Sequence, residues 1–293
     1  MKNLRAIIFL LLVLGVIIYF RNDLPGVEKN IEAYFKRANI ATSTTSLISD
    51  LKQEIVAPPP LRQSGGGATA LPDNLTASGV ISLTNQNREQ NGNLNDLTVN
   101  AKLTAAAQEK LNDMFKNQYF EHVSPSGRGP ADLANDVSYQ YLVIGENLAL
   151  GNFGSDKDLV DAWMASPGHR ANILNARYKE IGVAVGAGKF NGEETWLAVQ
   201  EFGEPLSDCS SPDASTKQSI DTLEATISGL NDDLVVKKSA LNATSPSDPT
   251  YNQKANAYNA EVNQYNVDIG QEKTLIDQYN AEVKNFNTCA GAN

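Results

Sequence analysis

The sequence predicts an α+β domain over residues 79–205, with an apolar segment before it and a pair of long helices after it. Three observations carry this prediction. Apolar residues recur at helical spacing between residues 80 and 115, β-forming residues flank an Asn191-Gly192 turn, and two heptad patterns follow residue 209. Helices followed by an antiparallel hairpin are typical of an α+β domain.

Composition excludes one class of partner. The 293 residues include 24 basic and 34 acidic side chains, for a net charge of −10. A nucleic-acid-binding protein needs basic residues to displace phosphate counterions, so we expect no nucleic-acid partner. A polybasic patch that holds anionic lipid is excluded for the same reason. Any contact with a membrane must therefore come from apolar sequence.

Such sequence lies in residues 1–22. Residues 6–20 are apolar throughout and are flanked by Arg5 and Arg21. As a helix this run spans about 22 Å, which is shorter than the ~30 Å hydrocarbon core, but the two arginines can snorkel to the interfaces. Because no small-x-small cleavage site follows, we expect a single-pass anchor in the cell membrane with the rest of the chain outside the cytoplasm. The alternative is a cleaved signal and a secreted protein.

Residues 23–78 read as a stalk and a linker. Leu47, Leu51 and Ile55 have helical spacing, which favours a stalk next to the membrane. The runs Ala57-Pro58-Pro59-Pro60 and Ser64-Gly65-Gly66-Gly67 then predict a flexible linker, because such sequence buries little apolar surface.

Within residues 79–205 the pattern predicts three helices and a hairpin. The first helix covers residues 80–90, and the second has an apolar stripe that includes Leu103, Leu111 and Met114. A capping box at Ser155 opens the third helix, which buries a face that includes Trp163. Strands over residues 181–185 and 196–202 are joined by the Asn-Gly turn.

Residues 206–293 predict an antiparallel helical hairpin of the coiled-coil type. Its first seam is Ile220, Leu223, Ile227, Leu230 and Leu234, and its second is Tyr258, Val262, Tyr265, Ile269, Ile276, Tyr279, Val283 and Phe286. The break at Pro246 and Pro249 separates them. Cys209 and Cys289 frame the hairpin, so we expect a disulfide outside the cytoplasm; two free thiols are the alternative. The hairpin is also a candidate surface for oligomerisation.

The chain has two histidines, and each lies in a distinctive segment. His122 follows Tyr119-Phe120-Glu121, and His169 lies in Ser166-Pro167-Gly168-His169-Arg170. Glu146, in Gly145-Glu146-Asn147, stands between them. A site made of two imidazoles and a carboxylate is one interpretation. The other is that both histidines are satisfied packing residues.

These segments resemble a known family. The motifs YFEHVSP, GENLALG, AWMASPGHRANILN, EIGVAVG and WLAVQEFG, in this order, are similar to the bacterial branch of the CAP superfamily, which includes SCP-like, cysteine-rich secretory, antigen 5 and pathogenesis-related 1 proteins. The resemblance covers about 125 residues and implies an α-β-α sandwich with a cleft lined by a His/Glu tetrad. It implies that His122, His169 and Glu146 bind a divalent metal such as zinc, and that Ser166, Asn147 and Arg170 line the cleft.

The chain departs from this pattern at the second glutamate of the tetrad. That position falls three residues after Trp163, on Ser166, which is not a carboxylate. Asp158 and Asp161 on the same helix are candidates to replace it. The resemblance therefore implies at most a His-Glu-His triad. The alternative is a structural role, in which Glu146 holds its turn and Arg170 makes an ion pair.

Three functions are compatible with these residues. The first, which we favour, is a membrane-tethered binding module whose cleft takes a lipid, a cell-wall fragment or a protein. The second is a metal-dependent hydrolase or peptidase, with Glu146 as the candidate general base. No HExxH motif or nucleophile elbow is present, which argues against this second function. The third is an interaction role carried by the C-terminal hairpin.

Overall fold

The computed structural model describes residues 53–63 and 75–291. The predicted anchor over residues 1–22, and the predicted stalk up to residue 52, lie outside these residues. Among the helices of the described part, none has both the length and the apolar character that a membrane span requires.

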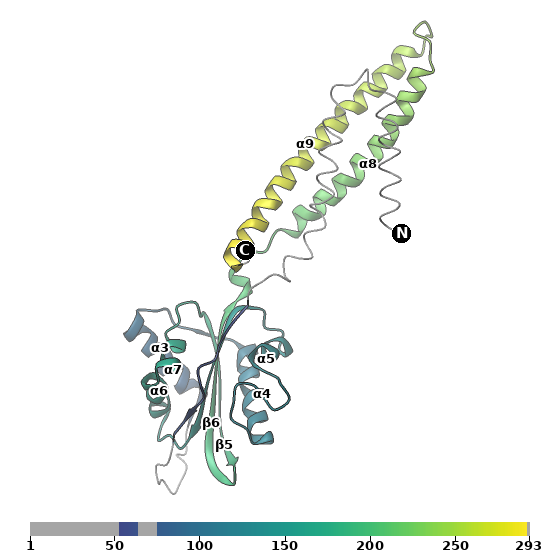
Figure 1. Cartoon of the computed structure of the whole chain (residues 1–293). Helices are drawn as coiled ribbons and strands as arrows, with labels where there is room; N and C mark the ends of the chain where they lie inside the picture. The colour runs from purple at the N-terminus through teal and green to yellow at the C-terminus, as the bar shows by residue number, and fades with distance from the viewer. Residues whose placement is uncertain (1–52, 64–74, 292–293) are drawn as a thin grey trace. The chain divides into compact units, whose positions relative to one another are not determined.

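A mixed sheet with helices on both faces forms the globular domain (Figure 1). Its centre is antiparallel, with β6 (Glu193–Pro205) paired on one side with β4 (Tyr141–Gly151) and on the other with β5 (Glu180–Phe190). One face carries α3 (Ala77–Gly92), α6 (Asp156–Ala165) and α7 (Pro167–Ile173), and the other carries α4 (Ala101–Asn117) and α5 (Pro130–Asp136). The domain therefore has three layers, with the sheet in the middle.

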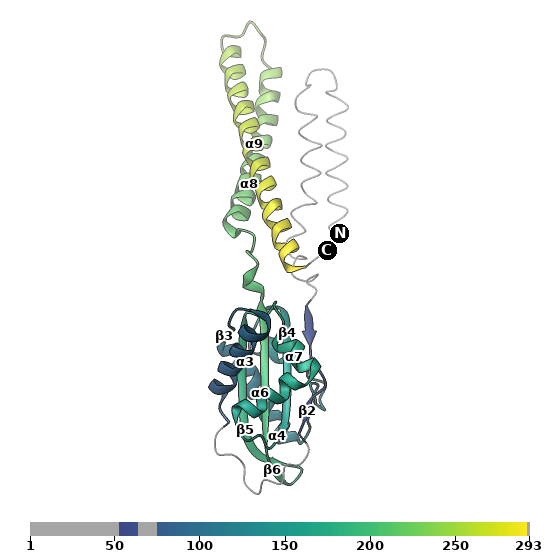
Figure 2. The ribbon, with the colours of Figure 1, turned by 90° about the vertical axis from the view of Figure 1, so that its left-hand side faces the viewer.

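Short strands complete both edges of the sheet. The order is β1-β4-β6-β5-β3, and β2 also pairs with β4. β3 (Thr98–Val99) runs parallel to β5, while β1 (Glu54–Val56) and β2 (Leu61–Arg62) run parallel to β4 (Figure 2). Because β1 and β2 lie upstream of α3, residues far from β4 in sequence cover its outer edge.

The turn between β5 and β6 has the predicted position. Phe190 pairs with Glu193, so the loop consists of Asn191 and Gly192 alone. Their φ angles are 51° and 87°, both in the left-handed region. This is the conformation that an Asn-Gly pair adopts most readily, and its twist matches that of the flanking strands.

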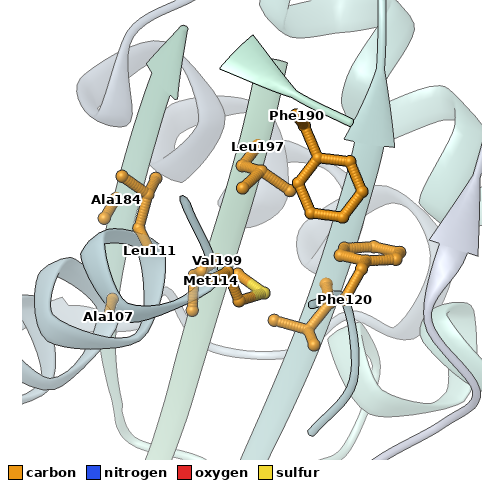
Figure 3. Packing of buried hydrophobic residues seen from close by; sticks show 9 residues of the cluster. Ala107, Leu111, Met114, Phe120, Ala184, Phe190, Leu197 and Val199 are labelled. Carbon is orange, nitrogen blue, oxygen red and sulfur yellow. The ribbon is translucent and has the colours of Figure 1, made fainter. Parts of the chain in front are cut away.

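Helix α4 packs its apolar stripe on the sheet. At its start the Asn100 side chain accepts hydrogen bonds from the amides of Lys102 and Leu103. Gly182 on β5 permits the close contact, because a Cβ atom there would lie 2.2 Å from the backbone of Leu103. The core cluster between helix and sheet is shown in Figure 3 and consists of Ala107, Leu111, Met114, Phe120, Leu148, Ala184, Phe190, Leu197 and Val199.

Residues 53–63 depart from the sequence prediction. The sequence assigned Ile55 to a helical stalk and Pro58 to a linker that buries little surface, but these residues form β1, β2 and the turn between them, and Pro58 is buried. For these residues the prediction is wrong. β1 and β2 are too short to show an alternating pattern, and proline is accepted where an edge strand makes no ladder hydrogen bond.

The C-terminal helices are α8 (Ala214–Asn242) and α9 (Tyr251–Ala290). They run antiparallel, since the Asp213 amide donates to Glu282 at one end and Lys237 pairs with Glu261 further along. Every residue of the two predicted seams is buried or half-buried. Cys209 and Cys289 form a disulfide with their Cα atoms 5.7 Å apart, which confirms the predicted bridge.

Candidate functional site

His122 lies in the loop after α4, and a buried lysine holds that loop in place. The Lys110 ammonium donates to the backbone carbonyls of Glu121 and His122, each at 2.7 Å. Only 1% of Lys110 is exposed. Burial lowers the pKa of Lys110, and the carboxylates of Glu146 and Glu201 oppose this effect. A charged amine thus fixes the backbone that carries the first histidine.

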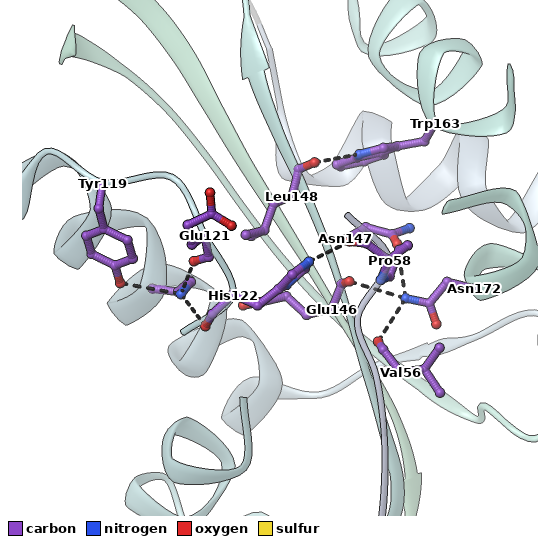
Figure 4. Close-up of polar contacts among 11 residues, drawn as sticks. Val56, Pro58, Tyr119, Glu121, His122, Glu146, Asn147, Leu148, Trp163 and Asn172 are labelled. Carbon is purple, nitrogen blue, oxygen red and sulfur yellow. Dashed lines mark hydrogen bonds and ion pairs between the residues drawn. The ribbon is translucent and has the colours of Figure 1, made fainter. Parts of the chain in front are cut away.

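Glu146 on β4 contacts the imidazole directly. Its Oε1 atom lies 2.5 Å from His122 Nδ1, and its side chain is fully buried (Figure 4). His122 keeps 13% of its side chain exposed, so the pair lies just inside the surface. A carboxylate in this position orients the ring and selects which nitrogen faces outward.

Glu201 on β6 is a member of this cluster that the sequence analysis missed. It is the direct cross-strand partner of Glu146, and 3% of it is exposed. Burial, and then the charge and hydrogen bond of Glu146, raise the pKa of Glu201 well above its ordinary value. Glu146 Oε2 and Glu201 Oε1 have no hydrogen-bond partner among the described residues, and a proton on Glu201 would provide a donor between the two carboxyl groups. The one signal in the sequence is an acidic residue within the apolar run WLAVQEFG.

His169 on α7 approaches the same edge of the sheet from the opposite layer. Its Nδ1 atom lies 2.8 Å from Ser166 Oγ, so Ser166, where the family pattern has a carboxylate, positions the second imidazole instead. Nε2 makes no hydrogen bond with the described residues. Burial, and next the neighbouring His122, lower the pKa of His169 to about 4, although the Leu148 carbonyl opposes this shift. His169 is therefore neutral at pH 7.

Asn147 and Asn172 join the two layers beside the histidines. Asn172 Nδ2 donates to Asn147 Oδ1 at 3.0 Å and lies 3.3 Å from the Glu146 carbonyl (Figure 4). Asn147 in turn donates to Gln200 Oε1, and Tyr178 donates its hydroxyl proton to Asn172 Oδ1. This buried amide network fixes α7 against β4, and thereby fixes His169 relative to Glu146.

Three other residues that the sequence suggested for the cleft do not contact the two histidines. Arg170 is exposed, and its hydrogen bond goes to Asn91 on α3 rather than to the imidazoles. Asp161 is exposed and pairs with Lys157 one turn earlier on α6. Asp158 is also exposed, with its amide bonded to Ser155. Neither aspartate replaces the second glutamate; the second carboxyl group beside Glu146 belongs to Glu201.

The segment from residue 53 to residue 63 covers the site. The carbonyl oxygen of Pro58 lies 2.5 Å from His122 Nε2 (Figure 4). A carbonyl oxygen can only accept a hydrogen bond, so Nε2 carries the hydrogen in this arrangement. Both ring nitrogens of His122 are then engaged, one by Glu146 and one by Pro58.

The residues as arranged do not fit a divalent metal. A metal ligand must offer the lone pair of an unprotonated nitrogen, and His122 has none free while Pro58 is in place. Within residues 53–63 and 75–291, no group of three or more His, Cys, Asp and Glu side chains is arranged to hold a metal ion. The unpartnered Nε2 atom of His169 is a single ligand, which is too few for a stable site.

Comparison with known proteins agrees with this architecture. Residues 81–202 match the family model described as CAP, the cysteine-rich secretory protein family. These residues form a CAP domain. The histidines, Glu146 and Glu201 all fall inside the match, whereas the segment that carries Pro58 falls outside it.

Two proteins of Bacillus subtilis are similar to the CAP domain in sequence. The uncharacterized protein YkwD of Bacillus subtilis is 38% identical over 117 residues, which cover 39% of this chain and 45% of that protein. The uncharacterized membrane protein YlbC of the same organism is 32% identical over 106 residues, which cover 36% of this chain and 30% of that one. The chain thus spans less than half the length of these two relatives.

Two solved structures also match part of the chain. An extracellular protein of Bacillus anthracis that contains an SCP domain is 26% identical, with a TM-score of 0.37 over 43% of this chain and 39% of that chain. An outer surface protein of Borrelia burgdorferi is 24% identical, with a TM-score of 0.37 over 43% of this chain and 90% of that chain.

Proposed function

We propose that this protein is a binding module that acts outside the cytoplasm, tethered to the membrane by residues 1–22, and that its ligand binds along the edge of β4. The observation that carries the proposal is the state of His122. Its two nitrogens bond to a buried carboxylate and to a peptide carbonyl, as they would in a recognition site. A general base or a metal ligand needs one ring nitrogen whose lone pair is free, and both nitrogens of His122 are already engaged.

The buried floor of the site supports recognition rather than turnover. Lys110, Glu146 and Glu201 are buried and bonded to one another or to the backbone, so they are fixed before any ligand arrives. Polar groups fixed in this way are typical of a binding site, where they set orientation and specificity. The apolar run of residues 6–20, flanked by Arg5 and Arg21, supports the location.

The test compares the full-length protein with His122→Ala in a screen of lipid vesicles, cell-wall fragments and peptides. We expect the variant to lose at least tenfold in affinity for the ligand that the wild type binds. Val123→Ala is the matched control, because Val123 is the exposed neighbour in the same loop. If His122→Ala retained every affinity, the edge of β4 would not be the binding surface.

The alternative is a metal-dependent hydrolase or peptidase, and elemental analysis separates it from the first proposal. We expect no stoichiometric metal in the purified full-length protein and no rise in its unfolding temperature on addition of zinc. One metal ion per chain that disappears in both His122→Ala and His169→Ala would replace the binding proposal with a metal centre.

We also propose that the α8–α9 hairpin is a self-contained arm closed by its disulfide, rather than the determinant of an oligomer. Every seam residue of α8 and α9 is buried or half-buried within the hairpin, although Val235, Val236 and Val267 are exposed. Light scattering of the full-length protein over a range of concentrations should give the mass of one chain. A stable dimer that is lost when residues 207–293 are removed would assign oligomerisation to the hairpin.

A further inference from the structure

Residues 53–63, which we call the strap, lie along the edge of β4 on both sides of His122. β1 pairs with residues 143–145 and β2 pairs with residues 149 and 150, both in parallel. The Gln63 amide extends the pairing by donating to the Leu150 carbonyl at 3.0 Å. A peptide that adds a strand to the edge of a sheet binds in the same way, with main-chain hydrogen bonds supplying affinity.

The pairing is interrupted where the strap passes the site. Between the pairs Val56–Gly145 and Leu61–Ala149, the strap has residues 57–60 while β4 has residues 146–148. Three of the four strap residues are prolines, which have no amide hydrogen for a ladder. The interruption leaves the Pro58 carbonyl free to accept from His122 Nε2. The proline run therefore lies where the strap contacts His122.

Side chains around the edge hold the strap from several elements. Asn172 on α7 lies 3.4 Å from the Val56 carbonyl, and Arg177 pairs with Glu54 at 2.9 Å. The Arg62 guanidinium lies 4.8 Å from the centre of the Phe120 ring. With the contacts of Pro58, the domain thus contacts an acidic residue, Glu54, a buried proline, Pro58, and a basic residue, Arg62, in that order along the strap.

Gly168 on α7 provides space for the buried proline. A Cβ atom at residue 168 would lie 2.8 Å from Pro58 Cβ, and its three nearest neighbours would all be atoms of Pro58. Pro58 is itself buried, while Pro59 beside it is exposed. One proline of the three thus lies between the two histidine-bearing segments.

We propose that the edge of β4 is a binding site for an extended, proline-containing peptide, and that the strap is its ligand in cis, which a second peptide of the same kind displaces. The inference rests on the proposed function of this edge as a binding site. Proline-rich peptides lose little conformational freedom on binding, because their extended conformation is formed in advance. Since the strap belongs to the same chain, its effective concentration at this edge is in the millimolar range, so it competes strongly with any free peptide.

The test uses the full-length protein and a fluorescent peptide with the sequence QEIVAPPPLRQ, which is that of residues 53–63. The double variant Glu54→Lys with Arg62→Glu removes two contacts that hold the strap on the edge of β4. It changes neither the CAP domain nor the net charge. We expect the peptide to bind this variant at least tenfold more tightly than it binds the wild type. The control is Lys217→Glu with Asp221→Lys, which reverses the charges of an ion pair on α8. We expect this control to bind the peptide with the same affinity as the wild type.

Two outcomes overturn the inference. One is a peptide affinity for the double variant equal to that for the wild type. The other is equal binding of a scrambled peptide. Either result would mean that the strap only covers the edge of β4 and does not mark a peptide-binding site. The His122→Ala screen would still test the proposed function separately.

A substitution in α7, rather than in the strap, provides an independent test. Gly168→Ala places a methyl group against Pro58, and alanine also favours the helix in which it lies. We expect hydrogen exchange of residues 54–62 to accelerate at least tenfold while exchange in α7 is unchanged. Gly229→Ala on α8 is the control, because a Cβ atom there meets nothing within 4 Å. Unchanged exchange of residues 54–62 in Gly168→Ala would overturn the inference.

Discussion

Replacement of Glu201 by glutamine tests the protonation of the buried carboxyl pair. Glu201 and Glu146 are directly opposite on β6 and β4, and both are buried beside Lys110. Burial, and then Glu146, raise the pKa of Glu201 well above the ordinary value of 4.5. The folded protein therefore retains a proton on Glu201 at pH values where the unfolded chain has released it.

The size and sign of the effect follow from this difference. Because the folded state binds the extra proton, the stability that Glu201 contributes to the wild type falls as pH rises above 4.5, by at most about 1.4 kcal/mol per pH unit, until the folded pKa is reached. Glutamine has the same shape and donates a hydrogen bond, as the protonated carboxyl does, but it takes up no proton on folding. The stability of Glu201→Gln relative to the wild type should therefore increase with pH over this range.

The assay is urea denaturation of the full-length protein at several pH values between about 4 and 8, with the free energy of unfolding extrapolated to water. Lys110→Met is the contrasting variant. It removes two charge-assisted hydrogen bonds and leaves the buried carbonyls of Glu121 and His122 without this donor, which costs about 2–4 kcal/mol. A constant loss of stability in Glu201→Gln at every pH would refute the reasoning, because it would mean that Glu201 binds its proton equally in the folded and unfolded states.

Three further predictions concern single features. Burial lowers the pKa of His169 to about 4, so the stability of the wild type relative to His169→Gln should fall by about 3 kcal/mol as pH decreases from 6.5 to 4 in urea titrations, and a difference that does not change with pH would contradict this. Gly145→Ala places a Cβ atom 2.1 Å from the Tyr178 hydroxyl and should lower the free energy of unfolding by about 3 kcal/mol, whereas Gly186→Ala, with 3.1 Å to Leu111, should lower it less. Replacing both Cys209 and Cys289 by serine opens a loop with a sequence separation of 80 and should cost about 4–5 kcal/mol in helix unfolding followed by circular dichroism. An unfolding midpoint unaffected by reduction of the wild type would argue against that last value.

Local patterns in the sequence predicted the elements that local interactions determine. The turn at Asn191 and Gly192 is one case, because two residues with positive φ suffice to fix it. The helix that begins after Ser155 is another, since its first turn is capped by that side chain alone. In both cases the residues that decide the structure are neighbours in the chain.

The role of Glu201 could not be predicted in this way. Its position opposite Glu146 depends on the register between β4 and β6, whose paired residues lie far apart in the sequence. Along β6, residues 195–203 are buried on both faces, so no alternation of apolar and polar residues reveals which side chains face α4. The family pattern directed attention to the position of Ser166, which proves to position His169 rather than to supply a carboxyl group.

The strap shows why the family resemblance alone does not determine the function of this chain. Both histidines and Glu146 are present, and Glu201 provides a second carboxyl group, so the residues that the family pattern associates with a metal are nearly all retained. What prevents the expected arrangement is a peptide carbonyl at residue 58, which requires a hydrogen on the nitrogen that a metal would need. That residue lies outside the matched range of 81–202. The state of the site is therefore set by a segment that does not belong to the matched domain, and binding studies on a fragment that begins after residue 63 would examine a different site.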